Sequence, residues 1–155
     1  EAVRTMARIA ERTEGDIDYR KRFSQAKVSE LCNVTDAISH ATCAAAHDLN
    51  AAAVITVSKS GMTGRMISKF RPLVPIIGCS PDEKVLRQMN LSWGVMPIYV
   101  EEKKSTDELF EAAVSAARQA GVIKDGDLTV ITAGVPLGKS GTTNMMRIHV
   151  VGEPM

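Results

Sequence analysis

The segment AAAVITVSKSGMTGRMISKFRPLVPIIGCS, residues 51–80, has the pattern of a strand, a helix and a second strand. Residues 51–58 form a continuous apolar run, which is typical of a strand covered on both faces of a sheet. A helical pattern follows over 61–71, and residues 74–80 predict a second buried strand. A helix placed between two buried strands predicts that the strands run parallel.

The alternation of strands and helices continues towards the C-terminus. Further helices are predicted over 81–91 and 105–121, and further strands over 96–100, 128–134 and 146–151. Pro81 suits a helix start, while Ser105 and Glu108 form a capping box and Gly121 ends that helix. The last two strands are joined by a loop too short for a parallel crossover. The sequence therefore predicts an α/β fold, three-layer α/β/α, with a five-stranded, mostly parallel sheet and an antiparallel C-terminal edge strand.

The N-terminal third has a different pattern. Residues 2–12 predict an amphipathic helix, whereas the glycine and charges of residues 15–23 indicate a solvated linker. Asn33 is suited to cap a helix over 34–49. The stripe of that helix expected to pack closely on a neighbouring element consists of Val34, Ala37, Ile38, Ala41, Ala44, Ala45 and Leu49.

Composition narrows the possible function. With 155 residues, of which 45% are hydrophobic, the chain can bury one core and is expected to form mainly one domain. A formal net charge of +1 gives no general attraction to nucleic acid or to a membrane. Cys32, Cys43 and Cys79 have no spacing typical of a disulfide framework or a zinc site. This cysteine pattern predicts a protein of the reducing cytoplasm. The sequence has no apolar run of about 18 residues, which predicts that the protein is soluble.

Two loops are candidates for binding an anion, because each follows a predicted parallel strand and ligands bind outside the carboxyl ends of such strands. The first loop comprises Ser58, Lys59, Ser60, Gly61, Met62 and Thr63. The second comprises Gly138, Lys139, Ser140, Gly141 and Thr142. Hydroxyls, lysines and backbone amides of both loops could hold a phosphate between them if the strands are neighbours. Taken singly, the first could be a plain helix cap and the second a flexible turn.

Gly138, Lys139 and Ser140 also match the end of the nucleotide-binding pattern GxxxxGK[ST]. In that pattern, the position five residues before Gly138 should be glycine, but it is Ala133. The pattern should also open a helix, whereas residues 144–151 predict a strand. A phosphate clamp is therefore favoured over a nucleotide-binding loop.

Other polar residues give weaker signals. His40 and His47 lie on nearly the same helix face without a set of metal ligands around them, and His149 is expected to be exposed on the edge strand. Trp93 is expected to be a packing anchor rather than a ligand contact. No nucleophile with its base and no carboxylate pair for magnesium is visible, so we predict no catalytic residue and no metal site.

Several segments together resemble the C-terminal regulatory domain of bacterial pyruvate kinases. They are EAVRTMARIAERTE, AAAVITVSKSGMTGRMISKFRPLVPIIGCSPDE, WGVMPIYV and GDLTVITAGVPLGKSGTTNMMRI. The resemblance implies that residues 1–14 correspond to the end of the last helix of a catalytic barrel and its exit, and that 15–155 form the regulatory domain. It also implies that Mg²⁺ and K⁺ belong to the barrel, so that this chain has no cofactor and is catalytically silent alone.

The resemblance further implies an allosteric role within an enzyme that makes pyruvate and ATP from phosphoenolpyruvate and ADP in glycolysis. Both candidate loops correspond to the family's effector site, and a cytoplasmic homotetramer in contact through these domains is expected. Members that bind fructose 1,6-bisphosphate carry an arginine where this chain has Leu109, which favours AMP or a sugar monophosphate as effector. A stand-alone enzyme or nucleotide-binding protein using the GKS loop, and a purely structural tetramerisation domain, are the alternatives.

Overall fold

The computed structural model describes residues 1–25, 33–137 and 143–155. Its strands form one sheet in the order β3-β2-β1-β4-β5. Four strands are parallel: β1 (Ala53–Val57), β2 (Ile76–Ser80), β3 (Val95–Tyr99) and β4 (Leu128–Ala133). The fifth, β5 (Met145–Val150), pairs antiparallel with β4 at the edge. The predicted α/β fold and its antiparallel edge strand are therefore confirmed.

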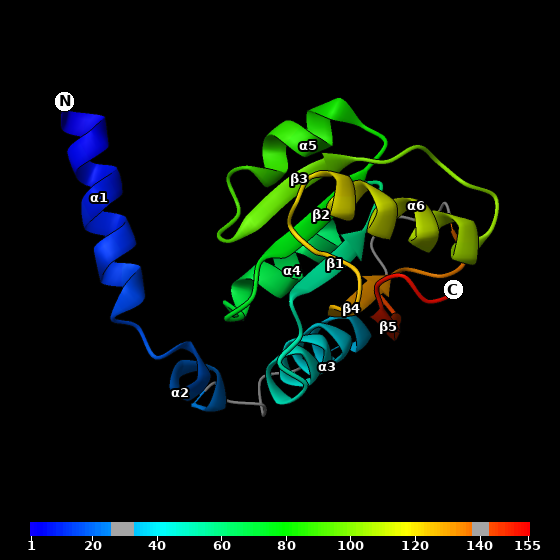
Figure 1. Cartoon of the computed structure of the whole chain (residues 1–155), viewed down its shortest axis with the longest axis horizontal. Helices are drawn as coiled ribbons and strands as arrows, with labels where there is room; N and C mark the ends of the chain where they lie inside the picture. Colours follow the sequence, from blue (N-terminus) through cyan, green and yellow to red (C-terminus); the bar gives the residue numbers. More distant parts are fainter. Residues whose placement is uncertain (26–32, 138–142) are drawn as a thin grey trace.

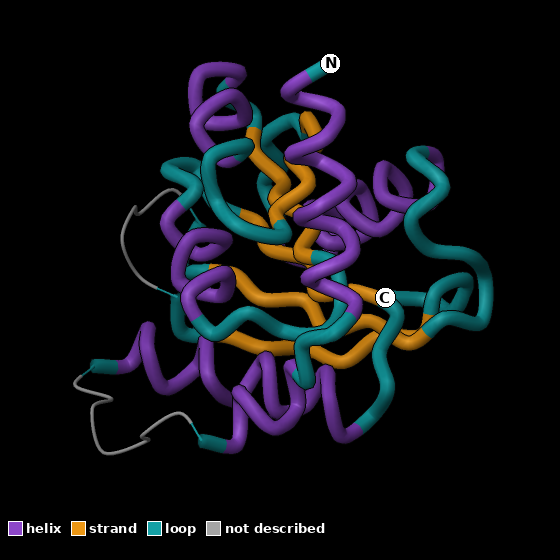
Figure 2. Tube along the Cα trace, turned by 90° about the vertical axis from the view of Figure 1, so that its left-hand side faces the viewer, coloured by secondary structure: helices purple, strands orange, loops and turns teal. Residues whose placement is uncertain are grey.

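Helices cover both faces of the sheet (Figures 1 and 2). One face carries α3 (Val34–Asp48), α4 (Met62–Lys69) and α5 (Glu83–Met89), and the other carries α6 (Thr106–Gln119). The chain order explains this division. The connections from β1 to β2 and from β2 to β3 proceed in one direction, so right-handed crossovers place α4 and α5 on the same face. The connection from β3 to β4 returns in the opposite direction, which places α6 on the other face.

The apolar core has a part on each side of the sheet. On the α6 side, Phe110 is fully buried among residues such as Ile55 and Ile131. On the other side, Cys43 of α3 and Ile67 of α4 pack over the central strands. Because β1 and β2 contribute side chains to both parts, every residue of these two strands is buried. This explains why their sequences are apolar without alternation.

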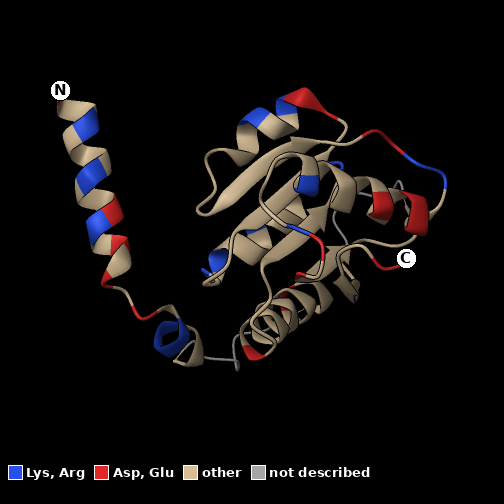
Figure 3. Cartoon of the chain, viewed as in Figure 1, with Lys and Arg blue, Asp and Glu red and all other residues tan. Residues whose placement is uncertain are grey.

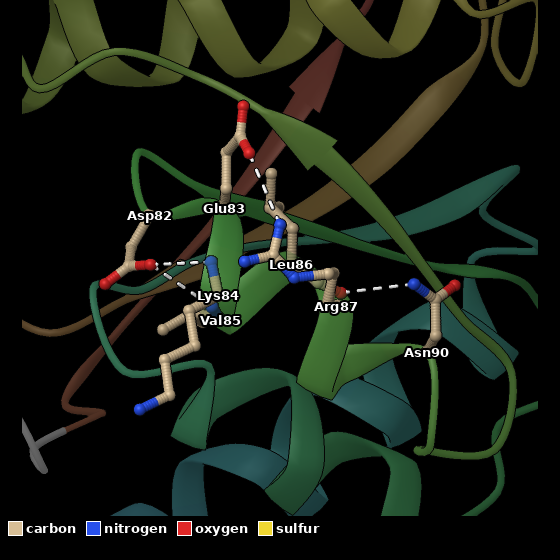
Figure 4. A network of polar contacts seen from close by, with 7 residues as sticks. All are labelled: Asp82, Glu83, Lys84, Val85, Leu86, Arg87 and Asn90. Atoms are coloured by element: carbon tan, nitrogen blue, oxygen red, sulfur yellow. Dashed lines mark hydrogen bonds and ion pairs between the residues drawn. The ribbon is translucent and has the colours of Figure 1, made fainter.

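Helix α5 shows how local sequence sets an element (Figure 4). The Asp82 carboxylate accepts hydrogen bonds from the backbone N–H groups of Lys84 (2.7 Å) and Val85 (3.3 Å), which satisfies two donors of the first turn. Glycine permits the helix to pack closely on β2, because a Cβ at Gly78 would lie 2.7 Å from the Met89 sulfur. The predicted helix is thus confirmed, but it begins at Glu83 with Asp82 as its cap, two residues after Pro81.

The predicted face of α3 is wrong. Val34, Ala37 and Leu49 of the apolar stripe are exposed, and the helix instead buries its more polar side. The residues buried there are Asp36, Ser39, Thr42, Cys43, Ala46 and His47. Small side chains let α3 pack closely, and Thr42 satisfies its hydroxyl by donating to the Ile38 carbonyl (2.8 Å). Hydrophobicity alone therefore indicated the wrong side of this helix.

Helix α1 (Ala2–Gly15) extends away from the remainder of the chain (Figure 1). The predicted helix is confirmed, and Val3, Met6 and Ile9 form its apolar face. None of its residues is buried by the described part of the chain.

The predicted linker over 15–23 is partly wrong, because it contains most of a short helix, α2 (Tyr19–Ser24). The Asp18 carboxylate caps this helix by accepting from the Lys21 N–H (2.9 Å). Tyr19 is buried against Trp93, with ring centroids 5.4 Å apart. The Arg71 guanidinium lies over the Trp93 ring, 5.4 Å from its centroid. Trp93 is thus a packing residue, as its sequence context indicated, at the amino end of β3.

A second group of aromatic rings fixes α2 to the same edge of the sheet. Phe23 stacks on His40 at 4.7 Å and meets His47 edge-on at 4.9 Å. The His47 Nε2 accepts a hydrogen bond from the Leu73 N–H (3.0 Å), so the proton of the neutral ring lies on Nδ1. Since residues near 73 and 93 precede β2 and β3, α2 lies at the amino-terminal ends of the strands.

Candidate functional site

The candidate site lies at the opposite, carboxyl-terminal edge. Strands β1 and β4 are parallel neighbours, and Val57 is in register with Ala133. The segments that directly follow β1 and β4 therefore leave the sheet side by side. They also flank the position where the order of the strands reverses, since β2 and β3 lie beyond β1 while β5 lies beyond β4. Open α/β sheets bind their ligands at such a position.

A hydroxyl pair links the far ends of the two loops. Thr63 lies in the first turn of α4 and Thr143 lies just before β5, and their Oγ1 atoms are 2.8 Å apart. Both residues are almost completely buried, so this hydrogen bond is shielded from water. The Thr143 N–H donates to the Thr35 hydroxyl (3.3 Å), which adds the start of α3 to the same junction. Residues 80 positions apart in sequence are thus held together next to the candidate loops.

Asn144 closes the base of the second loop. Its side-chain oxygen accepts from the Val135 N–H (2.8 Å), and its side-chain nitrogen donates to the Val135 carbonyl (2.6 Å). Its own N–H donates to the Ala133 carbonyl (3.2 Å). The predicted site residues Gly138, Lys139, Ser140, Gly141 and Thr142 lie outside the described residues, so their part of the clamp stays a prediction.

The described residues of the first loop divide into exposed and buried ones. Lys59, Ser60 and Met62 are exposed, Ser58 is half-buried, and Gly61 and Thr63 are buried. Gly61 has a φ of +71° and its position would bring a Cβ to 3.0 Å from Val85 and Met89, so glycine suits both the turn and the packing.

The amino end of α4 lies at this loop. Helix α4 begins without a side-chain cap and without an acidic residue in its first turn. The Ser60 hydroxyl only approaches the Met62 N–H, at 3.4 Å. The positive end of the α4 dipole therefore meets the loop without a neutralising carboxylate in that turn.

The charge of the Lys59 ammonium is balanced from another strand. Lys59 follows β1, and it forms an ion pair with Glu102, which follows β3. Leu109 is uncharged, and its side chain is 7% exposed and belongs to the α6-side core. Sequence reasoning missed Glu102, Thr143 and Asn144. Asn144 carried a weak signal as a turn-forming residue, while the roles of the other two depend on contacts between distant segments.

A cavity of about 630 Å³ adjoins the threonine junction. It is lined by Asn33, Val34, Thr35, Met62, Met66, Thr143 and Asn144. Its lining combines polar residues with the apolar side chains of Val34, Met62 and Met66. Such a combination suits a small ligand that has both a polar and an apolar part.

The remaining polar candidates take structural places. His149 is 7% exposed, so the expectation that it is exposed is wrong. The even-numbered residues of β5 face α3, whereas His149 lies on the other face of the sheet, where α6 covers it. Burial, followed by the Arg147 charge, lowers the pKa of His149, and Glu153 opposes the shift. Burial raises the pKa of the Cys43 and Cys79 thiols to about 12, so both stay protonated and act as packing residues.

Three further findings bear on the sequence interpretation. Over residues 1–25, 33–137 and 143–155, no group of three or more potential ligands could hold a metal ion. Residues 145–150, after the GKS sequence, form strand β5. The predicted strand is thus confirmed, and it is the wrong context for a nucleotide-binding loop. No helix in the described ranges is long and apolar enough to span a membrane.

Sheet order, helix placement and the two strand-end loops define an open, three-layer α/β domain with a candidate ligand site at its strand-reversal point. Residues 36–149 match the family model described as "Pyruvate kinase, alpha/beta domain". The chain belongs to this family, as the resemblance of its sequence motifs indicated.

Relatives that match almost the whole chain agree with this assignment. The chain is 48% identical to a pyruvate kinase of Clostridium acetobutylicum, over 97% of this chain and 32% of that protein. It is 42% identical to a pyruvate kinase of Geobacillus stearothermophilus, over 99% of this chain and 26% of that protein. A crystal structure of a pyruvate kinase from Cryptosporidium parvum superposes with a TM-score of 0.85 at 29% identity, covering 96% of this chain and 29% of that one. The chain therefore spans about a quarter to a third of the length of these relatives.

Proposed function

We propose that this chain is an effector-binding and subunit-contact domain of a pyruvate kinase, and that it binds a phosphorylated metabolite between residues 58–63 and 138–142. The observation that carries the proposal is the hydroxyl pair of Thr63 and Thr143, because it joins the ends of both loops beside the neighbouring strands β1 and β4. The ammonium of Lys59 and the amino end of α4 supply positive charge for a phosphate. Catalysis, with Mg²⁺ and K⁺, is assigned to a barrel domain of the whole enzyme.

The proposed effector is a monophosphate, such as AMP or a sugar monophosphate. Leu109 is buried in the core, and so this position offers no cation for a second phosphate. The adjoining cavity, partly lined by Met62 and Met66, offers room for the rest of the molecule. Binding would act by stabilising one of two arrangements of the subunits.

The proposed subunit contact is the outer side of β5. Among the described residues, this strand pairs only with β4, and Ile148 is half exposed on it. An edge strand of this kind offers free backbone groups to the same strand of a second copy.

Titration calorimetry with AMP, ribose 5-phosphate and fructose 1,6-bisphosphate tests the site. We expect Lys59→Met to weaken binding of the monophosphates about ten-fold, the effect of losing one charge-assisted hydrogen bond. Lys124→Met is the matched control, since this exposed lysine lies in the turn before β4 at the other edge. Equal affinity of the wild type and Lys59→Met would overturn the site, and tighter binding of the bisphosphate would overturn the monophosphate preference.

A further inference from the structure

The segment between β3 and α6 places a carboxylate on the candidate phosphate loop. Residues 101–104 carry two acidic and then two basic side chains, and Figure 3 shows this change of charge along the connection. Glu102 reaches past β2 to pair with Lys59, although the two residues follow strands that are not neighbours. A carboxylate of the protein thus already pairs with the Lys59 ammonium, to which a phosphate would bind.

The two acidic residues of this segment have different partners. Glu101 pairs with Lys103, two positions further along the same segment, at 3.5 Å. Glu102 pairs with Lys59 on another loop. Only the second of these two pairs therefore links the segment to the candidate site, while both carboxylates have the same charge and are exposed to solvent.

We propose that Glu102 is a displaceable counter-ion of the effector site, which holds Lys59 while the site is empty and is expelled when a phosphate binds. This inference rests on the proposed function. The Lys59 and Glu102 side chains are 44% and 58% exposed, so water can solvate each of them when the pair separates. A phosphate oxyanion carries more charge than a carboxylate and can also accept hydrogen bonds from the loop amides, which allows it to replace Glu102.

The segment that carries Glu102 is connected to α6 and, through α6, to β5. The released segment leads directly to Ser105, which caps α6 by accepting from the Glu108 N–H (3.2 Å). In the next turn of chain, Asp107 pairs with Arg147 of the edge strand β5 at 2.8 Å. The contacts of residues 102–107 therefore connect the effector loop with the strand proposed as the subunit contact.

The test compares two variants of equal net charge, Glu102→Gln and Glu101→Gln, in the full chain. Inorganic phosphate is titrated, and binding is followed by the NMR shifts of the amides of residues 59–64. We expect Glu102→Gln to bind phosphate about two- to five-fold more tightly than the wild type, the effect of an exposed ion pair. Glu101→Gln should bind like the wild type. In a Lys59→Met background, Glu102→Gln should bring no gain.

Each other outcome contradicts the proposal in a distinct way. Equal binding by the wild type and Glu102→Gln would overturn the displaceable counter-ion and leave the effector site in place. An equal gain in both glutamine variants would assign the effect to overall charge and overturn it as well. No phosphate-dependent shift in the wild type or in either variant would overturn the proposed function, and the counter-ion with it.

Discussion

The two sides of the sheet at which the parallel strands begin and end, its amino-terminal and carboxyl-terminal edges, are held by different kinds of contact. At the amino-terminal edge, α2 is held by aromatic rings, with Tyr19 against Trp93 and Phe23 between two histidines. At the carboxyl-terminal edge, hydroxyl and amide groups dominate, with the Thr63–Thr143 pair as the buried junction. The aromatic edge gains its free energy from burying apolar area, whereas the polar edge carries the hydrogen-bonding groups of the proposed site.

This difference predicts that stability and binding can be changed separately. Substitutions at the aromatic edge should reduce the free energy of unfolding and change the environment of Trp93, which is the single tryptophan of the chain. Substitutions at the polar edge should leave the Trp93 environment unchanged. Trp93 fluorescence therefore distinguishes the two edges in every experiment below.

The largest effect is expected for Phe23→Ala. This half-buried ring contacts His40, His47 and Phe70, and its loss should lower the free energy of unfolding by about 2 kcal/mol, less than for a fully buried phenylalanine. Urea unfolding measures the change, and Trp93 emission should shift to longer wavelength as α2 loosens. Leu91→Ala is the control, because that side chain is 91% exposed. An unchanged midpoint for Phe23→Ala would show that α2 adds nothing to stability.

A smaller loss is expected at the polar junction. Thr143→Val leaves the Thr63 hydroxyl buried without its partner, which should cost about 1–2 kcal/mol. The double variant Thr63→Val/Thr143→Val should cost clearly less than the sum of the two single variants, because no orphaned hydroxyl remains. Urea unfolding of all four proteins gives the coupling, and additive losses would contradict a direct bond. Trp93 emission of the folded variants should match that of the wild type.

The smallest effect is expected from pH at the aromatic edge. Burial, followed by the charge of Arg20 on α2, lowers the pKa of His47, and Asp48 opposes the shift. The native state therefore disfavours protonated His47. Its contribution is complete above the ordinary histidine pKa of about 6.5, and it is lost as pH falls from there through the lower native pKa.

Two controls isolate this histidine. The pKa of His149 is also lowered, and so part of any loss of stability in acid belongs to the other side of the sheet. Trp93 lies at the α2 edge, against Tyr19, and among the described residues Arg20, His40 and Asp48 are the titratable and charged groups that line one pocket with His47. In His47→Gln, the acid-induced change of Trp93 emission should disappear. A change of equal size in that variant would exclude His47 as its cause.

The sequence predicted the sheet and the positions of its elements because strand–helix alternation, caps and continuous apolar runs are local patterns. Ser105 and Asn33 cap their helices as expected, and β5 runs antiparallel. The predictions of which side of α3 and of β5 is buried were wrong where burial did not follow hydrophobicity. α3 buries Asp36 and Thr42 because close packing favours small side chains with local hydrogen-bond partners, and His149 is covered by α6.

The candidate site was predictable only in part. Each loop carried its own signal in glycine, lysine and hydroxyl residues. Because each loop follows a predicted parallel strand, the sequence also predicted that both lie at the carboxyl-terminal edge of the sheet. The contacts between the loops had no such signal. Thr143 and Glu102 gain their roles from partners 80 and 43 positions away, Thr63 and Lys59, and no spacing rule connects residues at those distances.

For this chain, the sequence by itself determined the strands, the helices other than α2, and which loops carry the hydroxyls, lysines and glycines expected of an anion site, since these properties depend on neighbours along the chain. Only the tertiary structure decided that β1 lies beside β4, that Thr63 meets Thr143, and that a carboxylate from beyond β3 neutralises Lys59. The physical reason is that sheet order and side-chain packing minimise the free energy of the whole core, and they bring together groups whose separation in sequence carries no information about their contact.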